Sequence, residues 1–203
     1  MIGIVDYGSG NVQAIATIYK NLNLECKIIA NPSELELADK LILPGVGAFD
    51  ATMEQLLESG LKEKLDHLVL NEKRPVLGIC VGMQILADSS EEGLLPGLGW
   101  IPGKVKKIDT SNFVHKPYLP HMGWNVLKPL HESIFTDIEE TLGFYFVHSY
   151  YFECQNSENV LGTTNYGAKF TCAVKHQNIY GMQFHPEKSH SNGVKLLKNF
   201  ASL

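Results

Sequence analysis

Positive charge that could bind nucleic acid is scarce in this sequence. Arg74 is its only arginine, and the formal net charge of the 203 residues is −5 at pH 7. Guanidinium groups form paired hydrogen bonds to phosphate, and basic clusters attract it electrostatically, so we expect no nucleic-acid partner. The densest basic cluster consists of Lys104, Lys106 and Lys107, which we interpret as the solvated edge of a strand.

Cysteine is sparse and irregularly placed. The 4 cysteines, at positions 26, 80, 154 and 172, contain no C-x-x-C pair. This placement favours reduced thiols over a disulfide framework or a zinc site. Apart from the segment around His185, the histidines lack paired ligand spacing with cysteine or carboxylate. We therefore expect no metal and no other cofactor.

Long apolar runs are missing as well. No stretch approaches the roughly 18 apolar residues that a membrane helix needs, and the opening residues lack a basic segment followed by a long apolar one. Hydrophobic residues make up 44% and charged residues 19% of the chain, which is typical of a soluble globular protein. We expect a cytoplasmic protein without membrane association.

The apolar pattern of the first half predicts parallel strands joined by helices. Short apolar runs at 2–5, 27–30 and 40–45 alternate with helical patterns, the rhythm of strand and crossover helix. An amphipathic helical stripe over 51–70 is interrupted near Gly60. After it, the apolar run that ends at residue 80 predicts a buried central strand.

The second half has a different texture. Beyond about residue 97, short aromatic and β-branched stretches are separated by turn residues, which predicts antiparallel strands. A final helical pattern closes the chain, and no linker divides it. We expect an α/β fold in a single domain over 1–203: a doubly wound, mostly parallel central sheet with flanking helices and an additional antiparallel sheet region in the C-terminal half.

One motif joins the buried strand to the helix predicted after it. Residues 78–82 read G-I-C-V-G, the pattern of a nucleophile elbow, in which a sharp turn raises one side chain above the sheet. Gly78 and Gly82 leave room for the turn, and the N-terminus of a following helix favours a thiolate. Cys80 is therefore a candidate nucleophile; the alternative is a small apolar residue in a well-packed turn.

A candidate base lies near the end of the chain, where residues 183–189 read Q-F-H-P-E-K-S. In an extended segment His185 and Glu187 point to the same face, so the carboxylate can accept a hydrogen bond from the imidazole and fix its tautomer. Cys80, His185 and Glu187 then form a catalytic triad. The alternatives are a structural role for His185, or a base supplied by another histidine: His121, His148 or His190.

Donors for an oxyanion are available in a third motif. Residues 43–49 read L-P-G-V-G-A-F and place two glycines in a loop after a strand. The backbone N–H groups of Val46 and Gly47 can turn toward the site beside the N–H of Val81. One such donor typically stabilises a transition state by about 2.7 to 4 kcal/mol. A plain strand-to-helix turn is the alternative interpretation.

Six motifs together carry a resemblance to a known family: D-Y-G-S-G-N, L-P-G-V-G-A-F, L-G-I-C-V-G-M-Q, L-P-H-M-G-W-N, F-Y-F-V-H-S-Y-Y and Q-F-H-P-E-K-S. In order and spacing, over essentially the whole chain, they resemble the glutaminase subunits of imidazole glycerol phosphate synthases, which are class I glutamine amidotransferases. G-x-C-x-G-x-Q and H-P-E are specific for class I generally, the fourth and fifth motifs for this subunit. Val81 replaces an expected leucine, a minor departure because only its N–H is used.

The resemblance implies a reaction. Cys80 would attack the side-chain amide of L-glutamine to form a thioester, with His185 protonating the departing ammonia and Glu187 orienting His185. Water would then release glutamate. Gly47 would line both the substrate pocket and the oxyanion site, in a segment that the family keeps unproductive until a partner binds.

The resemblance also implies how the substrate is held. Gln84 and Glu92 match the positions that bind the α-amino end of glutamine. The backbone at Ser149 and Tyr150 matches the positions that bind its carboxylate.

A partner is implied as well: a (β/α)8-barrel cyclase, bound as a heterodimer, that uses the ammonia in histidine biosynthesis. Trp124, Tyr145 and Lys188 match positions near that interface, and the loop containing Asn11 would lie beside it. Residues 89–109 look most like paralogous subunits that supply ammonia to a sugar amidotransferase in surface polysaccharide biosynthesis. That pathway is the alternative.

Two further classes of function compete with an amidotransferase. A thiol hydrolase or peptidase on the same scaffold would act alone on a larger amide. A nucleotide-binding module would use residues 6–11 as a phosphate cradle, but Gln13 stands where the third glycine of that motif is needed.

Overall fold

The computed structural model describes residues 1–111, 119–131 and 133–203, and it is built around an eight-stranded sheet with the order β2-β1-β3-β4-β13-β12-β11-β8. Five neighbouring strands run parallel: β1 (Ile2–Val5), β2 (Cys26–Ile29), β3 (Lys40–Gly45), β4 (Val76–Cys80) and β13 (Ile179–Met182). Three antiparallel strands extend the sheet: β12 (Ala168–His176), β11 (Val160–Tyr166) and β8 (Lys128–Pro129). The predicted α/β class and mostly parallel sheet are confirmed.

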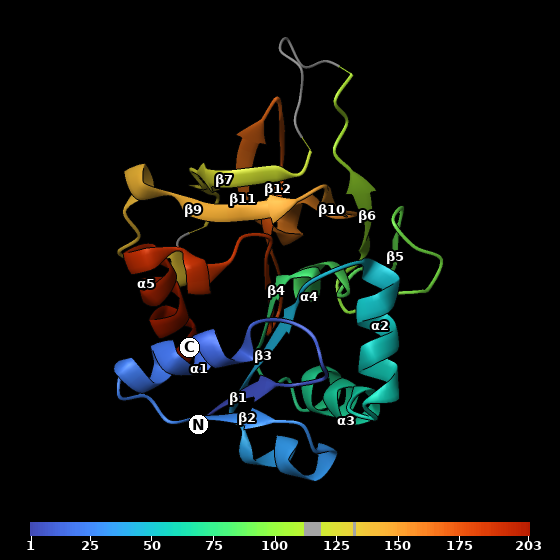
Figure 1. Ribbon diagram of the computed structural model, residues 1–203, viewed down its shortest axis with the longest axis vertical. Helices are drawn as coiled ribbons and strands as arrows, with labels where there is room; N and C mark the ends of the chain where they lie inside the picture. Colours follow the sequence, from blue (N-terminus) through green and yellow to red (C-terminus); the bar gives the residue numbers. More distant parts are fainter. Residues whose placement is uncertain (112–118, 132) are drawn as a thin grey trace.

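Helices cover both faces of this sheet (Figure 1). On one side lie α1 (Val12–Asn21) and α5 (His190–Ala201), and on the other α2 (Phe49–Glu58) and α3 (Lys62–Asp66), which a π-helical turn continues to Asn71. The predicted interruption near Gly60 is confirmed, because this glycine has a φ of 70° between α2 and α3. Short 3-10 helices complete the chain: η1 (Pro32–Leu37), η3 (Ser133–Phe135), η4 (Glu140–Leu142), η5 (Ser157–Asn159) and η6 (Pro186–Lys188).

Two smaller sheets form the additional region predicted for the C-terminal half. One has the order β10-β6-β5, from β10 (Tyr150–Cys154), β6 (Gly103–Lys107) and β5 (Ser89–Ser90). The other pairs β7 (His121–Asn125) with β9 (Phe144–His148) antiparallel. Figure 1 places the β7–β9 pair beyond the end of the central sheet where α4 lies, over the loops that leave β3 and β4.

The placement of the lysine cluster on a strand edge is wrong. β6 is the middle strand of its sheet, between β10 and β5. Lys106 lies 2.7 Å from a carboxylate oxygen of Glu153 on β10, and Lys104 lies 3.9 Å from Glu91. The lysines occur there because their side chains meet acidic residues across the strands, which a linear sequence does not display.

The hydrophobic core joins both halves of the chain. Every residue of β4 is buried, and the buried apolar side chains of the parallel strands are continuous with those of β9, β12 and α5. β4 therefore has a fixed position near the middle of the sheet, which also fixes the residue at its carboxyl end. Among the described helices, none has both the length and the apolar character needed to cross a bilayer.

Candidate active site

Cys80 is the last residue of β4 and precedes α4 (Val81–Gln84). Its φ of 55° and ψ of −113° are rarely adopted by residues other than glycine, and such strain persists only where the surroundings enforce it. A Cβ on Gly82 would lie 1.9 Å from the carbonyl oxygen of Leu43, so this close approach requires glycine. The turn has the geometry of a nucleophile elbow, with Cys80 at its tip.

The helix after Cys80 is shorter than the sequence pattern predicts. α4 has 4 residues, and the carbonyls of Ile85 and Leu86 accept hydrogen bonds from the N–H groups of Leu98 and Ile101 instead of continuing a helix. A single turn aligns few peptide dipoles, so the expected helix-dipole support for a thiolate is small. The chain turns here because the loop over residues 91–102 packs against this segment.

A histidine and a carboxylate reach the same edge from the neighbouring strand. β13 pairs parallel to β4, and His185 lies three residues beyond its end. Nδ1 of His185 is 2.8 Å from Oε1 of Glu187, and each side chain is 3% exposed. The extended backbone on which this pairing was predicted is wrong, because Pro186–Lys188 forms the 3-10 helix η6. The 3-10 turn still places the Glu187 carboxylate within hydrogen-bond distance of the His185 ring.

The electrostatics of His185 favour its charged form. Burial of the ring lowers its pKa, but the hydrogen bond to Glu187 and the electrostatic interactions with Cys80 and Glu187 outweigh burial and raise the pKa to about 10. Nε2 is buried and has no aligned hydrogen-bond partner among the described residues. The thiol thus interacts with the ring electrostatically without an aligned hydrogen bond, which leaves Nε2 able to exchange a proton.

These groups meet at a hollow of about 360 Å³. It brings together predicted site residues from five separate segments of the chain. The lining residues are Val46, Gly47, Cys80, Val81, Gln84, Glu92, Pro120, Val147, His148, Ser149, Tyr150, His185 and Lys188. Ligand sites of open α/β sheets lie at the carboxyl ends of the strands, because successive loops converge there.

The backbone of Val46 is already engaged. Its N–H donates to the Ser9 hydroxyl at 2.9 Å, and the same hydroxyl donates to the Val46 carbonyl oxygen at 3.1 Å. Gly47 is exposed and has a φ of 101°. In this arrangement the Val46 N–H cannot at the same time serve an oxyanion.

The side chains predicted to hold the amino end of a substrate have defined partners. Nε2 of Gln84 donates to the carbonyl oxygen of Tyr150 at 3.3 Å and to Oε1 of Gln183 at 3.1 Å. Oε2 of Glu92 accepts from the N–H of Phe49 at 2.9 Å, at the start of α2. Both side chains are thereby positioned on the wall of the hollow.

The four predicted interface residues lie on the outside. Trp124 is 47% exposed, and its ring stacks on that of His190 with centroids 5.1 Å apart. Nζ of Lys188 lies 5.7 Å from the centroid of the Tyr145 ring, within reach of a cation–π contact. Asn11 is exposed, and its side chain caps α1 by accepting from the N–H of Ala14. Trp124 and Tyr145 are neighbours across the β7–β9 pair.

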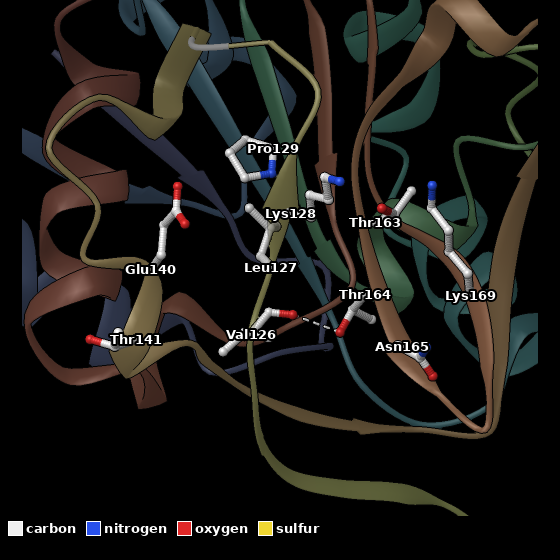
Figure 2. A pocket seen from close by; sticks show the side chains of 10 residues that line it. All are labelled: Val126, Leu127, Lys128, Pro129, Glu140, Thr141, Thr163, Thr164, Asn165 and Lys169. Atoms are coloured by element: carbon white, nitrogen blue, oxygen red, sulfur yellow. Dashed lines mark hydrogen bonds between the residues drawn. The ribbon is translucent and has the colours of Figure 1, made fainter.

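A larger hollow of about 670 Å³ lies elsewhere, between β8, β11 and the segment around Glu140 (Figure 2). One of its walls is closed by a hydrogen bond from the Thr164 hydroxyl to the Val126 carbonyl oxygen at 2.8 Å. Neither cysteine nor histidine lines it. The candidate thiol and imidazole both line the smaller hollow, which is therefore the candidate active site.

Several residues of the site are not among the predicted catalytic, oxyanion and substrate-binding residues, and one of them, His148, was considered only as an alternative base. Ser9, Pro120, Val147, His148 and Gln183 contact the predicted residues or line the same hollow. Each lies inside a motif that the sequence singles out, so proximity to a motif was the available signal. Their contacts depend on segments that are distant in the chain, and these contacts were not readable from spacing.

A doubly wound fold that brings a buried thiol, imidazole and carboxylate to one edge of the sheet is typical of enzymes with a cysteine nucleophile. The sequence profile of the family described as Glutamine amidotransferase class-I matches residues 3–202. The chain therefore belongs to the class I glutamine amidotransferase family.

Relatives and solved structures agree with this assignment. The chain is 53% identical to an imidazole glycerol phosphate synthase subunit HisH of Bdellovibrio bacteriovorus and 51% identical to one of Leptospira borgpetersenii, each over 100% of both chains. A crystal structure of a glutamine amidotransferase superposes with a TM-score of 0.72 at 20% identity, covering 99% of this chain and 97% of the other. At that identity the structural match shows the fold alone.

Proposed function

We propose that this chain is the glutaminase subunit of an imidazole glycerol phosphate synthase, folded as one domain over 1–203. It hydrolyses L-glutamine to glutamate and ammonia for a cyclase partner. The observation that carries the proposal is the convergence of Cys80, His185 and Glu187 at the ends of adjacent strands. Identity above 50% over the full length of relatives with that name supports the particular reaction.

In the first half-reaction, Cys80 attacks the side-chain carbonyl carbon of glutamine as a thiolate, because the thiol proton already lies on Nε2 of the charged His185 ring. The carbonyl oxygen becomes an oxyanion, for which the N–H groups of Gly47, Val81 and, once released from Ser9, Val46 are the available donors. Glu187 stabilises the resulting imidazolium through Nδ1.

Collapse of this intermediate breaks the carbon–nitrogen bond. His185 gives its proton to the leaving nitrogen, so ammonia departs and a thioester to Cys80 remains. Water then attacks the thioester while His185 takes its proton, and glutamate leaves as the thiol is restored. The buried His185–Glu187 pair supports both proton transfers, because its charge interactions favour the protonated ring.

The substrate ends would be bound on opposite walls of the hollow. Gln84 and Glu92 would hold the α-amino group, and the backbone N–H groups of Ser149 and Tyr150 the carboxylate. Ser149 is the single residue between β9 and β10, so its backbone has a defined direction at the edge of the site.

The outer face of β7 would bind the partner, a (β/α)8-barrel cyclase, in a heterodimer that acts in histidine biosynthesis in the cytoplasm. Met122 and Trp124 alternate along this strand and Val126 directly follows it; they are 62%, 47% and 54% exposed. Large exposed apolar groups at this density are typical of a protein interface. Lys188 lines the active-site hollow and contacts Tyr145 on this side, so ammonia leaving the hollow would emerge near the partner.

The test is glutamate production from glutamine by the chain alone, with the histidine-pathway cyclase of the same genome plus its nucleotide ligand, and with Cys80→Ala as control. Activity that requires the partner and disappears in the control is the expected result. Cys80-dependent activity that the cyclase does not raise would instead indicate a sugar-amidating partner. Activity independent of Cys80 would overturn the proposed triad.

A further inference from the structure

Two buried histidines outside the proposed triad form a continuous chain of hydrogen bonds. His121 on β7 and His148 on β9 lie opposite one another in the strand pair and are 3% and 6% exposed. Nδ1 of His121 is 3.0 Å from Nε2 of His148, and Nδ1 of His148 is 2.8 Å from the carbonyl oxygen of Tyr150. At the far end, the amide nitrogen of Asn125 is 3.2 Å from Nε2 of His121.

The two ends of the chain determine where each proton lies. A carbonyl oxygen only accepts, so His148 donates through Nδ1 to Tyr150 and accepts at Nε2. His121 must then donate through Nδ1 and accept at Nε2, where the amide nitrogen of Asn125 donates. Both rings are neutral, and all four of their nitrogens are occupied.

The orientation of the Asn125 amide is itself fixed by the backbone. Its nitrogen donates to the carbonyl oxygen of Asn165 at 2.8 Å, and its oxygen accepts from the N–H of Val126 at 2.8 Å. An amide turned the other way would place two acceptors or two donors in contact. The donor at the end of the histidine chain is therefore defined.

Aromatic packing holds the rings in place. The His121 ring stacks between Phe146 and Tyr166, at centroid distances of 4.9 and 4.2 Å, and Phe170 contacts both histidines edge-on. Burial lowers the pKa of His121 to about 4 and that of His148 to about 3. These rings remain uncharged at neutral pH and have little freedom to rotate.

The carbonyl that accepts from His148 belongs to Tyr150, whose N–H is one of the two donors proposed for the substrate carboxylate. The hydrogen bond from the His148 side chain to this carbonyl closes a short ring that contains the backbone of Ser149. The same carbonyl accepts from Gln84, so two side chains fix one peptide group. His148 also lines the hollow, yet it has no nitrogen left to accept a thiol proton.

We infer that His121 and His148 are positioning residues for the α-carboxylate of the substrate: their hydrogen-bonded chain sets the direction of the Ser149 and Tyr150 backbone N–H groups. The inference rests on the proposed function and adds two residues to it. The inference predicts a selective effect on binding, because only a substrate that carries the α-carboxylate is bound by the Ser149 and Tyr150 N–H groups.

The test compares glutamine with 4-aminobutanamide, which is glutamine without its α-carboxylate. KM and kcat for glutamine are measured on the partner-activated enzyme, and the inhibition constant of 4-aminobutanamide against glutamine is measured alongside. In His148→Leu we expect KM to rise about tenfold, with kcat within about threefold and the inhibition constant unchanged. His121→Phe, which keeps the stacking but loses the bond to His148, should raise KM by a smaller factor.

His176→Leu is the matched control. His176 is a half-buried histidine on β12 that contacts Asn159 at 3.3 Å and does not line the hollow, so its loss should move none of the three constants. If His148→Leu fails to fold, the same three constants measured for His121→Phe and for the unmodified enzyme test the inference. An unchanged KM in the folded variants, or a KM that rises together with the inhibition constant, would overturn the inference while leaving Cys80-dependent glutaminase activity, and hence the proposed function, intact. Absence of that activity in the unmodified enzyme would overturn both.

Discussion

The hollow that holds the candidate catalytic residues and the larger hollow beside β8 and β11 differ in what surrounds them more than in size. The larger, of about 670 Å³, lies on the antiparallel side of the sheet and is lined mainly by aliphatic, threonine and lysine side chains. The smaller, of about 360 Å³, lies where the parallel strands β3 and β4 end, and β13 delivers the base to it. Parallel strands release their loops at one edge, so distant residues converge there. The difference shows that convergence, and not volume, concentrates reactive groups.

The largest expected effect separates the two hollows directly. Cys80→Ala should lower glutaminase activity by at least about 10³-fold, because the hydroxyls of Ser149 and Tyr150, which also line the smaller hollow, are much weaker nucleophiles than a thiolate. Thr163→Val, an equally small change on the wall of the larger hollow, should leave activity within about twofold. Coupled detection of glutamate measures both. A comparable loss in Thr163→Val would mean that the larger hollow contributes to catalysis.

The next effect tests the electrostatics that distinguish the smaller hollow. The pKa of His185 is raised from 6.5 to about 10, so protonation stabilises the folded protein fully below about pH 6.5, and this contribution is lost as the pH rises through about 10. Glu187→Gln removes one of the two partners that raise the pKa. Activity should fall about 10²-fold, and the decline of unfolding free energy across this window should become shallower.

Activity profiles and denaturant titrations on both sides of the window measure these effects. Asp39→Asn, which alters an exposed carboxylate at the opposite end of the sheet, is the control. An unaltered pH profile in Glu187→Gln would show that the carboxylate does not act on His185.

A third change concerns the outer face of β7, which the smaller hollow adjoins and the proposed partner covers. Trp124→Ala removes a large exposed ring, and a central aromatic in an interface typically contributes about 2 kcal/mol. The cyclase concentration for half-maximal stimulation should then rise about 30-fold. Leu37→Ala, which truncates an apolar side chain that is 58% exposed on η1, should not change it. Equal titration curves for the two variants would exclude this face as the docking surface.

The smallest expected effect concerns the glutaminase activity of the chain without its partner. Ser9→Ala removes the hydroxyl that accepts from the Val46 N–H, so that N–H can turn toward an oxyanion, and partner-free activity should rise about tenfold. Thr52→Val is matched to it, because the Thr52 hydroxyl contacts only the carbonyl oxygen of Val46, at 3.5 Å. Partner-free glutamate release that is the same in Ser9→Ala and in the unaltered chain would show that this contact does not restrain the site.

Most of the fold was predictable from local pattern. The alternation of apolar runs and amphipathic stripes in the first half corresponds to β1 through β4 with α1, α2 and α3, including the interruption at Gly60. Prediction from this local pattern is wrong where backbone groups form hydrogen bonds to residues outside their own segment. α4 stops at Gln84, where the N–H groups of Leu98 and Ile101 bind the next two carbonyls, and β6 is a middle strand because β10 and β5 pair with its two edges.

The site divides in the same way. Cys80, His185 and Glu187 were recognisable because each requires a particular neighbour at a short, fixed spacing: a glycine on either side of the thiol, and a carboxylate two residues after the imidazole. The extended backbone that was expected to pair His185 with Glu187 is a 3-10 turn, so the two side chains do lie in contact but through a different local geometry. Ser9 was missed, and His148 was considered only as an alternative base, because their hydrogen-bond partners lie in other segments.

The succession of strands and helices, the tight turn at Cys80 and the candidate reactive side chains could be predicted from the linear sequence, because they follow from residue size, backbone freedom and short-range spacing. The folded structure was needed to show which hollow the candidate residues line, that Ser9 contacts Val46, and that His121 and His148 are joined in one chain of hydrogen bonds. Those contacts link residues up to 37 positions apart, and hydrogen bonds over such separations exist only once the sheet has brought the segments together.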